Sequence, residues 1–144
     1  MIEYKEIRSE YMEEAYKIYE ENHWESYLHH KDKLTRAFEK SLYIVGAFEN
    51  DRLVGFVRCV GDAEYILYVQ DLIVKPEYQR KGIGKELMRL VSEAFPTVRQ
   101  FVLITDADDK ISNEFYQAIG MSRDCNGYPI NTYFRTQSKN KYIK

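Results

Sequence analysis

Helical and strand-like hydrophobic spacings follow one another along the chain, and each predicts an element. Apolar residues that recur every three to four positions predict helices at residues 9–21, 32–40, 83–94 and 111–119. We expect Ser9 to cap the first helix and Gly120 to end the last one. Alternating or continuous apolar runs predict strands at residues 2–8, 42–48, 53–60, 65–74, 101–105 and 130–135.

The order of these elements predicts a fold class. Strands joined by short turns come first, and strand–helix–strand units follow. This order is typical of an α/β protein with a mixed, mostly antiparallel central sheet and helices on both faces. At 144 residues the chain is most simply one domain, residues 1–144, and residues 137–144 form a polar, basic tail.

Composition removes several classes of protein from consideration. The chain is 44% hydrophobic and 31% charged, as in ordinary globular proteins, and its formal net charge of -2 argues against a nucleic-acid partner. Cys59 and Cys125 lack the spacing of a disulfide framework or a metal site, and no histidine spacing demands a metal. Without an apolar leader or a membrane-length apolar run, we expect a cytoplasmic protein with no membrane partner.

One turn carries a clear chemical signal. A strand-like run ends at Val74, a basic turn containing Gly82 and Gly84 follows, and a helical spacing begins at Ile83. The start of a helix presents unpaired N–H groups and a partial positive charge, and therefore attracts anions. Glycine allows a bulky diphosphate to approach the backbone closely. The turn therefore predicts a pyrophosphate site.

Two sequence blocks resemble a known family. The segment Gln79-Arg80-Lys81-Gly82-Ile83-Gly84 matches the Q/R-x-x-G-x-G/A signature of the GNAT acetyltransferases, and residues 72–78 resemble that family's lead-in. Residues 115–121, Phe-Tyr-Gln-Ala-Ile-Gly-Met, are similar to its F-Y-x-x-x-G-F segment. The resemblance covers residues 65–121, with the two blocks in the family's order. Within the family, the chain is most similar to small microbial and plant members, including the arylalkylamine type.

The resemblance implies acetyl-CoA as co-substrate, without a metal. The residues that it assigns to acetyl-CoA are Leu72, Ile73, Val74, Gln79, Arg80, Lys81, Gly82, Ile83, Gly84, Lys85, Asp109 and Tyr116. Leu72 and Val74 are expected to pair their backbones with the pantetheine arm, and residues 79–85 to surround the diphosphate. Asp109 stands where the family often has asparagine. Because an ionised aspartate donates no hydrogen bond, Asp109 is expected to cap a helix, with a CoA contact as the alternative.

Amide formation from a thioester poses two proton-transfer problems. The amine must lose a proton before it attacks, and the CoA thiolate leaves faster when it is protonated. The resemblance places the acid at Tyr116; the alternative is that Tyr116 only fills a core. Where many relatives carry a glutamate base, this chain has Tyr68. Asp71 is the candidate base, and Glu64 is a weaker one; the alternative for Asp71 is a structural aspartate that hydrogen-bonds a neighbouring loop.

The acceptor side is less well specified. Residues 22–30 hold the only tryptophan and all three histidines, in the region where the family forms one wall of the acceptor site. Trp24, Tyr27 and Tyr68 are the candidate substrate contacts, and the alternative is an exposed loop with one anchored tryptophan. We expect an N-acetyltransferase in which a primary amine, of a small molecule or a peptide or protein lysine, attacks acetyl-CoA directly in a ternary complex. The alternative is a non-catalytic acyl-CoA-binding sensor or scaffold; a homodimer is compatible with either.

Overall fold

A computed structural model describes residues 1–123 and 129–137 of the chain. The chain forms two compact units, Met1–Leu103 and Ile104–Lys144, and each is described by itself. The elements of the first unit are β1 (Ile2–Glu6), α1 (Met12–Glu21), η1 (Glu25–Tyr27), α2 (Lys31–Glu39), β2 (Tyr43–Glu49), β3 (Arg52–Gly61), β4 (Ile66–Val74), η2 (Pro76–Tyr78), α3 (Ile83–Ala94) and β5 (Gln100–Val102). The second unit contains α4 (Lys110–Ala118).

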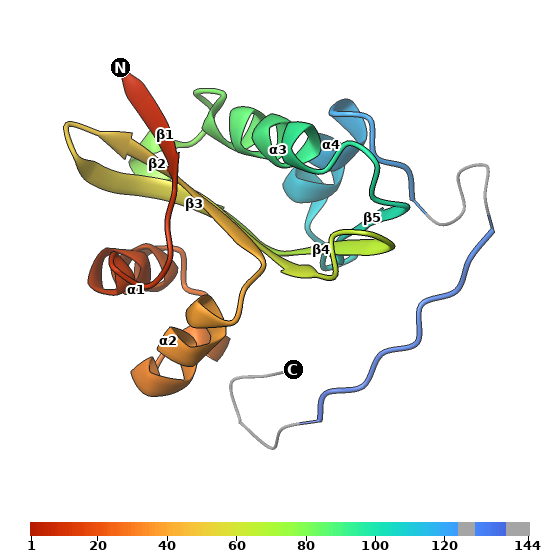
Figure 1. Cartoon of the computed structure of the whole chain (residues 1–144), viewed down its shortest axis with the longest axis horizontal. Helices are drawn as coiled ribbons and strands as arrows, with labels where there is room; N and C mark the ends of the chain where they lie inside the picture. Colours follow the sequence, from red (N-terminus) through yellow and green to blue (C-terminus); the bar gives the residue numbers. More distant parts are fainter. Residues whose placement is uncertain (124–128, 138–144) are drawn as a thin grey trace. The chain divides into compact units, whose positions relative to one another are not determined.

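The five strands form one sheet in the order β1-β2-β3-β4-β5. The pairs from β1 to β4 are antiparallel, and β5 runs parallel to β4. Helices α1 and α2 lie on one side of this sheet and α3 lies on the opposite side (Figure 1). This architecture confirms the predicted mixed, mostly antiparallel sheet with helices on both faces.

The face of the sheet toward α1 and α2 is packed largely with aromatic rings. One buried cluster joins the two helices to β2, β3 and β4 through Tyr19, Phe38, Phe48, Phe56 and Ile73. On the other face, α3 buries Ile83, Leu87, Met88 and Val91, as its apolar spacing predicts. Because apolar burial is the main stabilising term of a fold, these two layers fix the sheet between the helices.

A β-bulge in β4 decides which way its polar residues face. Asp71 lies opposite Arg58 and Val69 lies opposite Cys59, so Gln70 has no partner on β3. Residues directly opposite each other in an antiparallel pair share one face of the sheet, and a bulge shifts the alternation by one residue. Asp71 therefore shares the α1/α2 face with Tyr68, whereas regular alternation would have put it on the α3 face.

The same strand also has a free edge. Only Ile66–Tyr68 of β4 pair with β5, opposite Gln100–Val102. From Gln70 to Val74, β4 keeps β3 as a neighbour on one side, and no described strand pairs with its other side. Backbone groups on such an edge are available to an extended ligand.

Some predicted boundaries are wrong. Ser9 does not cap α1; Tyr11 holds the N-cap position, while the Ser9 hydroxyl donates to Glu39 (3.4 Å). The strand predicted at 101–105 is shorter, and residues 130–135 form no strand in the described part of the second unit, where Tyr133 is 91% exposed and without a neighbouring strand. The Asn126-Gly127 pair, whose sequence predicts a turn, and residues 138–144 of the expected tail lie outside the described residues. No described helix is long and apolar enough to cross a membrane.

Candidate active site

The turn after β4 has the backbone geometry of an anion site. Proline 76 starts η2, Arg80 and Gly82 adopt left-handed backbone conformations (φ 64° and 83°), and α3 begins at Ile83. Gly82 is the N-cap of α3, and no side chain from the described residues caps this end. The first N–H groups of α3 therefore lack a side-chain acceptor, and the positive end of the helix dipole adds to their attraction for an anion. Arg80, Lys81 and Lys85 are exposed around this turn.

The side-chain amide of Gln79 is engaged in hydrogen bonds within the protein. Its Nε2 donates to the carbonyl of Val74 and to Oδ1 of Asn22, both at 3.0 Å. Asn22 also donates through Nδ2 to the carbonyls of Ile18 (2.9 Å) and Val74 (3.1 Å). We call this pair, Asn22 and Gln79, the amide brace. It ties the first residue of the turn to the end of α1 and to the last residue of β4.

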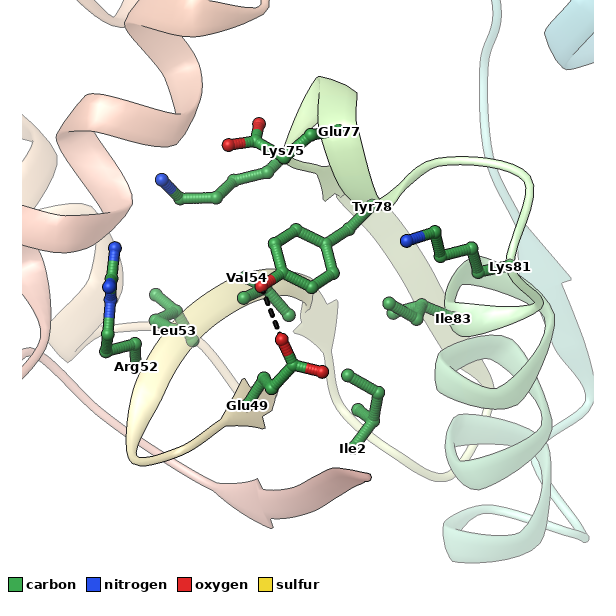
Figure 2. Close-up of a pocket in the computed structure, with 10 residues that line it drawn as sticks. All are labelled: Ile2, Glu49, Arg52, Leu53, Val54, Lys75, Glu77, Tyr78, Lys81 and Ile83. Carbon is green, nitrogen blue, oxygen red and sulfur yellow. Dashed lines mark hydrogen bonds between the residues drawn. The ribbon is translucent and has the colours of Figure 1, made fainter.

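A hollow of about 390 Å³ lies beside the turn. Figure 2 shows Tyr78 in its middle, with the Tyr78 hydroxyl donating to Glu49 (2.6 Å) and Lys81 and Ile83 to one side. Three cationic and two anionic side chains line it, together with an apolar floor. Of the residues predicted to bind acetyl-CoA, only Lys81 and Ile83 belong to its lining, so this hollow is distinct from the free edge of β4.

Asp71 is buried and fully engaged. Only 1% of its surface is exposed, and its Oδ2 accepts hydrogen bonds from Arg58 Nε and from the Tyr19 hydroxyl, each at 2.7 Å. Its Oδ1 accepts from the Tyr27 hydroxyl at 2.5 Å. A carboxylate that neutralises a guanidinium and holds two phenols is poorly placed to accept a proton from a substrate. The geometry favours the structural alternative, because Tyr27 belongs to the segment that connects α1 and α2.

The charges in this group reinforce one another. Burial lowers the pKa of the Arg58 guanidinium, but the charge and hydrogen bond of Asp71, together with Tyr19 and Tyr27, outweigh burial and raise it. Burial, and then the negative charge of Asp71, raise the pKa of the Tyr19 and Tyr27 phenols well above their usual value. Both phenols therefore stay protonated and act as donors near neutral pH.

Three rings, Tyr19, Trp24 and Tyr27, form what we call the aromatic cluster. The centroids of Tyr19 and Tyr27 lie 4.4 Å apart in a stacked arrangement, and Trp24 lies 6.3 Å from Tyr27. Trp24 and Tyr27 are half-buried. The structure thus brings two of the three predicted substrate residues together beside Asp71, and the register of β4 places Tyr68 on the same face.

All three histidines belong to the segment that carries Trp24 and Tyr27 of the aromatic cluster. His23, His29 and His30 are exposed, and His23 and His29 have positive φ angles. Within the described residues, no group of three His, Cys, Asp or Glu side chains could hold a metal ion.

In the second unit, α4 carries the remaining predicted residues. Asp109 caps this helix, with its carboxylate accepting from the N–H of Ser112 at 3.0 Å, which confirms the predicted capping role. Tyr116 is half-buried, its ring lies 5.1 Å from that of Phe115, and its carbonyl accepts from Met121. The catalytic assignment of Tyr116 remains a prediction.

Sequence reasoning overlooked three residues that shape the site: Asn22, Arg58 and Gln70. Arg58 could have been found, because it is a charged residue inside the apolar run Leu53–Val60. A buried charge requires a partner, and Asp71 is the other charged residue in a neighbouring apolar strand. Asn22 and Gln70 carry no comparable signal, since their roles depend on residues far away in the sequence.

Comparison with known proteins identifies the relatives of the chain. Residues 4–121 match the sequence model of the Acetyltransferase (GNAT) family. An uncharacterized ycf52-like N-acetyltransferase of Prochlorococcus marinus is 32% identical over 99 residues. This match covers 66% of the present chain and 54% of the cyanobacterial protein, so the chain spans about half the length of that relative.

Solved structures share the fold. A GNAT-family acetyltransferase of Streptococcus pneumoniae superposes with a TM-score of 0.82 at 30% identity, over 96% of this chain and 100% of the other. The PaiA N-acetyltransferase of Thermoplasma acidophilum, solved in complex with coenzyme A, superposes with a TM-score of 0.75 at 21% identity, over 88% of this chain and 94% of that one. Together these similarities confirm the predicted fold type.

Proposed function

Because the chain belongs to the GNAT acetyltransferase family, we propose that it transfers the acetyl group of acetyl-CoA to a primary amine. The observation that carries this proposal is the turn from Gln79 to Lys85, where a left-handed Gly82 precedes a helix start without a side-chain cap. The turn follows β4, a strand with a free edge, and the short helix η2. A diphosphate at the helix start and an extended arm along the edge of β4 fit these two features. The coenzyme A complex of the PaiA protein supports the same donor.

The proposed donor site uses backbone groups more than side chains. Leu72 and Val74 offer the free edge of β4 to the pantetheine arm, except for the Val74 carbonyl, which already accepts from the amide brace. The N–H groups from Gly82 to Lys85 offer donors to the diphosphate. The exposed cations of the turn add charge attraction. The side chain of Gln79 instead positions the turn through the amide brace.

The proposed reaction is a direct attack of the amine on the thioester. The amine nitrogen forms a bond to the acetyl carbon, and the bond from that carbon to the CoA sulfur breaks. Of the two protons that the ammonium form of the acceptor loses overall, one reaches solvent and one ends on the CoA sulfur. We assign the donation to sulfur to the Tyr116 hydroxyl, by resemblance to the family, because a neutral phenol can protonate a leaving thiolate.

For the acceptor, we propose an amine with a flat or cationic group. Trp24 and Tyr27 are half-buried aromatic residues that lie close together, and aromatic rings attract such a group. An arylalkylamine fits this description better than a long aliphatic amine, and this agrees with the subgroup that residues 71–79 and 115–116 resemble most.

A thiol-release assay tests the proposal. Acetyl-CoA is incubated with the chain and a panel of arylalkylamines, alkylamines, polyamines and lysine peptides, and free CoA is measured with a thiol reagent. Turnover that depends on one amine class supports the enzyme and names the acceptor. Tight binding of acetyl-CoA by calorimetry with no turnover across the panel would instead support the non-catalytic acyl-CoA sensor.

A further inference from the structure

A buried ion pair stands behind the aromatic cluster. Arg58 and Asp71 are 5% and 1% exposed and are the only charged side chains buried in the described part of the chain. Arg58 also donates from Nη1 to the hydroxyl of Ser41 at 3.2 Å. Removing two charges from water is costly, and well-packed apolar residues often stabilise a fold as well or better. We therefore expect the ion pair to have a role other than stabilising the fold.

The pair reaches the connecting segment between α1 and α2 through Tyr27. This residue ends η1, a three-residue helix that has no buried residue of its own. The hydroxyl of Tyr27 donates to Asp71 Oδ1 at 2.5 Å. In addition, the Tyr27 ring stacks on Tyr19, whose own hydroxyl donates to Oδ2 of the same carboxylate. Asp71 thus holds the two tyrosines of the aromatic cluster.

The bulge of β4 completes the contact. Gln70, the bulged residue, donates from Nε2 to the Tyr27 hydroxyl at 2.9 Å. A phenolic oxygen can donate once and accept, and that of Tyr27 does both here, toward two successive residues of β4. This contact lies two residues beyond Tyr68, the last β4 residue paired with β5, where the free edge of the strand begins.

We propose that the Arg58–Asp71 ion pair positions Tyr27, and through Tyr27 also Trp24, beside the bulge of β4. By holding these two rings in place, the ion pair determines how the acceptor binds. Asp71 exchanges no proton with the substrate in this scheme. The inference rests on the proposed acetyl transfer, and it assigns Tyr27 as a specificity-determining residue of the acceptor side. The donor side, formed by the free edge and the turn, does not depend on the Tyr27 hydroxyl.

The Tyr27→Phe variant tests this inference, because it removes one hydroxyl and keeps the ring. With an amine from the thiol-release panel, we expect the KM for the amine to rise at least fivefold and the KM for acetyl-CoA to stay within twofold. The pH profile of kcat should keep its shape. Tyr43→Phe is the matched control, since Tyr43 is also half-buried in this unit but packs edge-on against Phe95, away from the pair; both KM values should stay at the wild-type level.

Two measurements test the positioning without turnover. Trp24 is the only tryptophan, so its emission reports directly on the aromatic cluster, and Tyr27→Phe should shift it. Amide hydrogen exchange across residues 23–28 should become at least fivefold faster, while exchange in α3 stays unchanged. If wild-type protein acetylates no amine of the panel, the proposed function fails, but these two measurements still decide whether the pair positions the segment.

Asp71→Asn separates positioning from base catalysis. A positioning role predicts that this variant shares the raised amine KM of Tyr27→Phe and retains the pH profile of kcat. A hundredfold loss of kcat in Asp71→Asn with wild-type kinetics in Tyr27→Phe would identify Asp71 as the base and overturn the inference. Should Asp71→Asn not fold, because Arg58 is left without its partner, Tyr27→Phe alone decides: unchanged amine KM, exchange and emission together overturn the inference.

Discussion

At the scale of single residues, the proposed acceptor side depends on the hydrogen bonds of one carboxylate. Asp71 accepts three hydrogen bonds and neutralises Arg58, so its two oxygens are engaged inside the protein. The proton donor on the donor side is a separate matter, because a phenol needs only to reach the leaving sulfur. Tyr116 is the residue to which the family resemblance assigns that task.

Removing the Tyr116 hydroxyl tests this assignment. We expect Tyr116→Phe to lower kcat tenfold or more, a loss of about 1.4 kcal/mol of transition-state stabilisation, because the thiolate then leaves unprotonated. The affinity for acetyl-CoA, measured by calorimetry, should change little. Tyr133→Phe is the control in the same unit, since Tyr133 is 91% exposed. A kcat equal to that of the wild type in Tyr116→Phe would rule out the acid role.

At the scale of elements, the turn between β4 and α3 depends on contacts from the other end of the sequence. The amide brace links the end of α1 to Val74 and Gln79, and Lys75 forms an ion pair with Glu21 (3.5 Å) beside it. The helix that leads into the aromatic cluster is thereby tied to the turn proposed to bind the diphosphate. The proposed acceptor site and the proposed donor site are therefore connected through these contacts.

Loss of the amide brace should weaken donor binding. Asn22→Ala removes hydrogen bonds to Ile18, Val74 and Gln79, so we expect a free energy of unfolding lower by about 1–2 kcal/mol and a three- to tenfold higher Kd for CoA. Calorimetry and thermal unfolding measure both. Glu21→Ala is the comparison, because the adjacent Glu21 side chain is exposed and its ion pair contributes little. Equal CoA affinities for the two variants would contradict a role of the brace in binding.

Gly82 should matter more for binding than for stability. Its φ of 83° costs a non-glycine residue about 1 kcal/mol, but an added Cβ would meet no atom within 4 Å. Gly82→Ala should therefore fold, with a slightly lower Tm, and lose CoA affinity more than tenfold, because the methyl group would stand before the N–H groups of α3.

The control for Gly82 is another left-handed glycine away from the turn. At Gly61 an added Cβ would lie 2.3 Å from the carbonyl oxygen of Ile66, so Gly61→Ala should destabilise the fold more strongly. Its folded fraction should bind CoA like the wild type. A Gly82→Ala protein with undiminished affinity would show that the diphosphate does not approach this backbone.

At the scale of the whole molecule, the first unit contains buried acidic side chains whose pKa values are higher in the folded protein than in the unfolded chain. Burial raises the pKa of the Cys59 thiol to about 12, and burial with the charge of Asp71 raises those of Tyr19 and Tyr27. In the unfolded chain, these groups ionise near their ordinary values, about 8.5 for cysteine and about 10 for tyrosine. Folding therefore favours their protonated forms.

The sign of the resulting pH dependence follows from this difference. Below pH of about 8.5 the stabilisation is complete, and it is lost as pH rises toward the folded pKa values, because only the unfolded chain releases protons there. Cys59 alone should contribute a slope of about 1.4 kcal/mol per pH unit between its two pKa values. Thermal unfolding at pH 7, 9 and 10.5 should show a falling Tm, with a smaller fall in Cys59→Ala. An identical fall in both proteins would exclude Cys59 as a cause.

Much of the fold could be predicted from local patterns. The spacing from Ile83 to Val91 predicted α3 because one stripe of apolar residues must face the sheet. The capping role of Asp109 was predicted because an ionised aspartate, at a position where the family often has asparagine, can accept hydrogen bonds but not donate them. The strand at residues 130–135 was predicted from alternation alone and is absent from the described part of that segment. Alternation cannot reveal whether a neighbouring strand is present to pair with.

The sequence by itself indicated where the turn at Gln79–Lys85 lies, since proline, glycine and helical spacing act on the backbone within a few residues, and the amide brace from the end of α1 then holds that turn. The tertiary structure decided where Asp71 lies and which groups it bonds to. A bulge at Gln70 turns this carboxylate toward α1, where it meets Tyr19 and Tyr27, 52 and 44 residues away in the sequence. No local pattern encodes a one-residue shift in strand register, because its cause is the packing of distant side chains against the sheet.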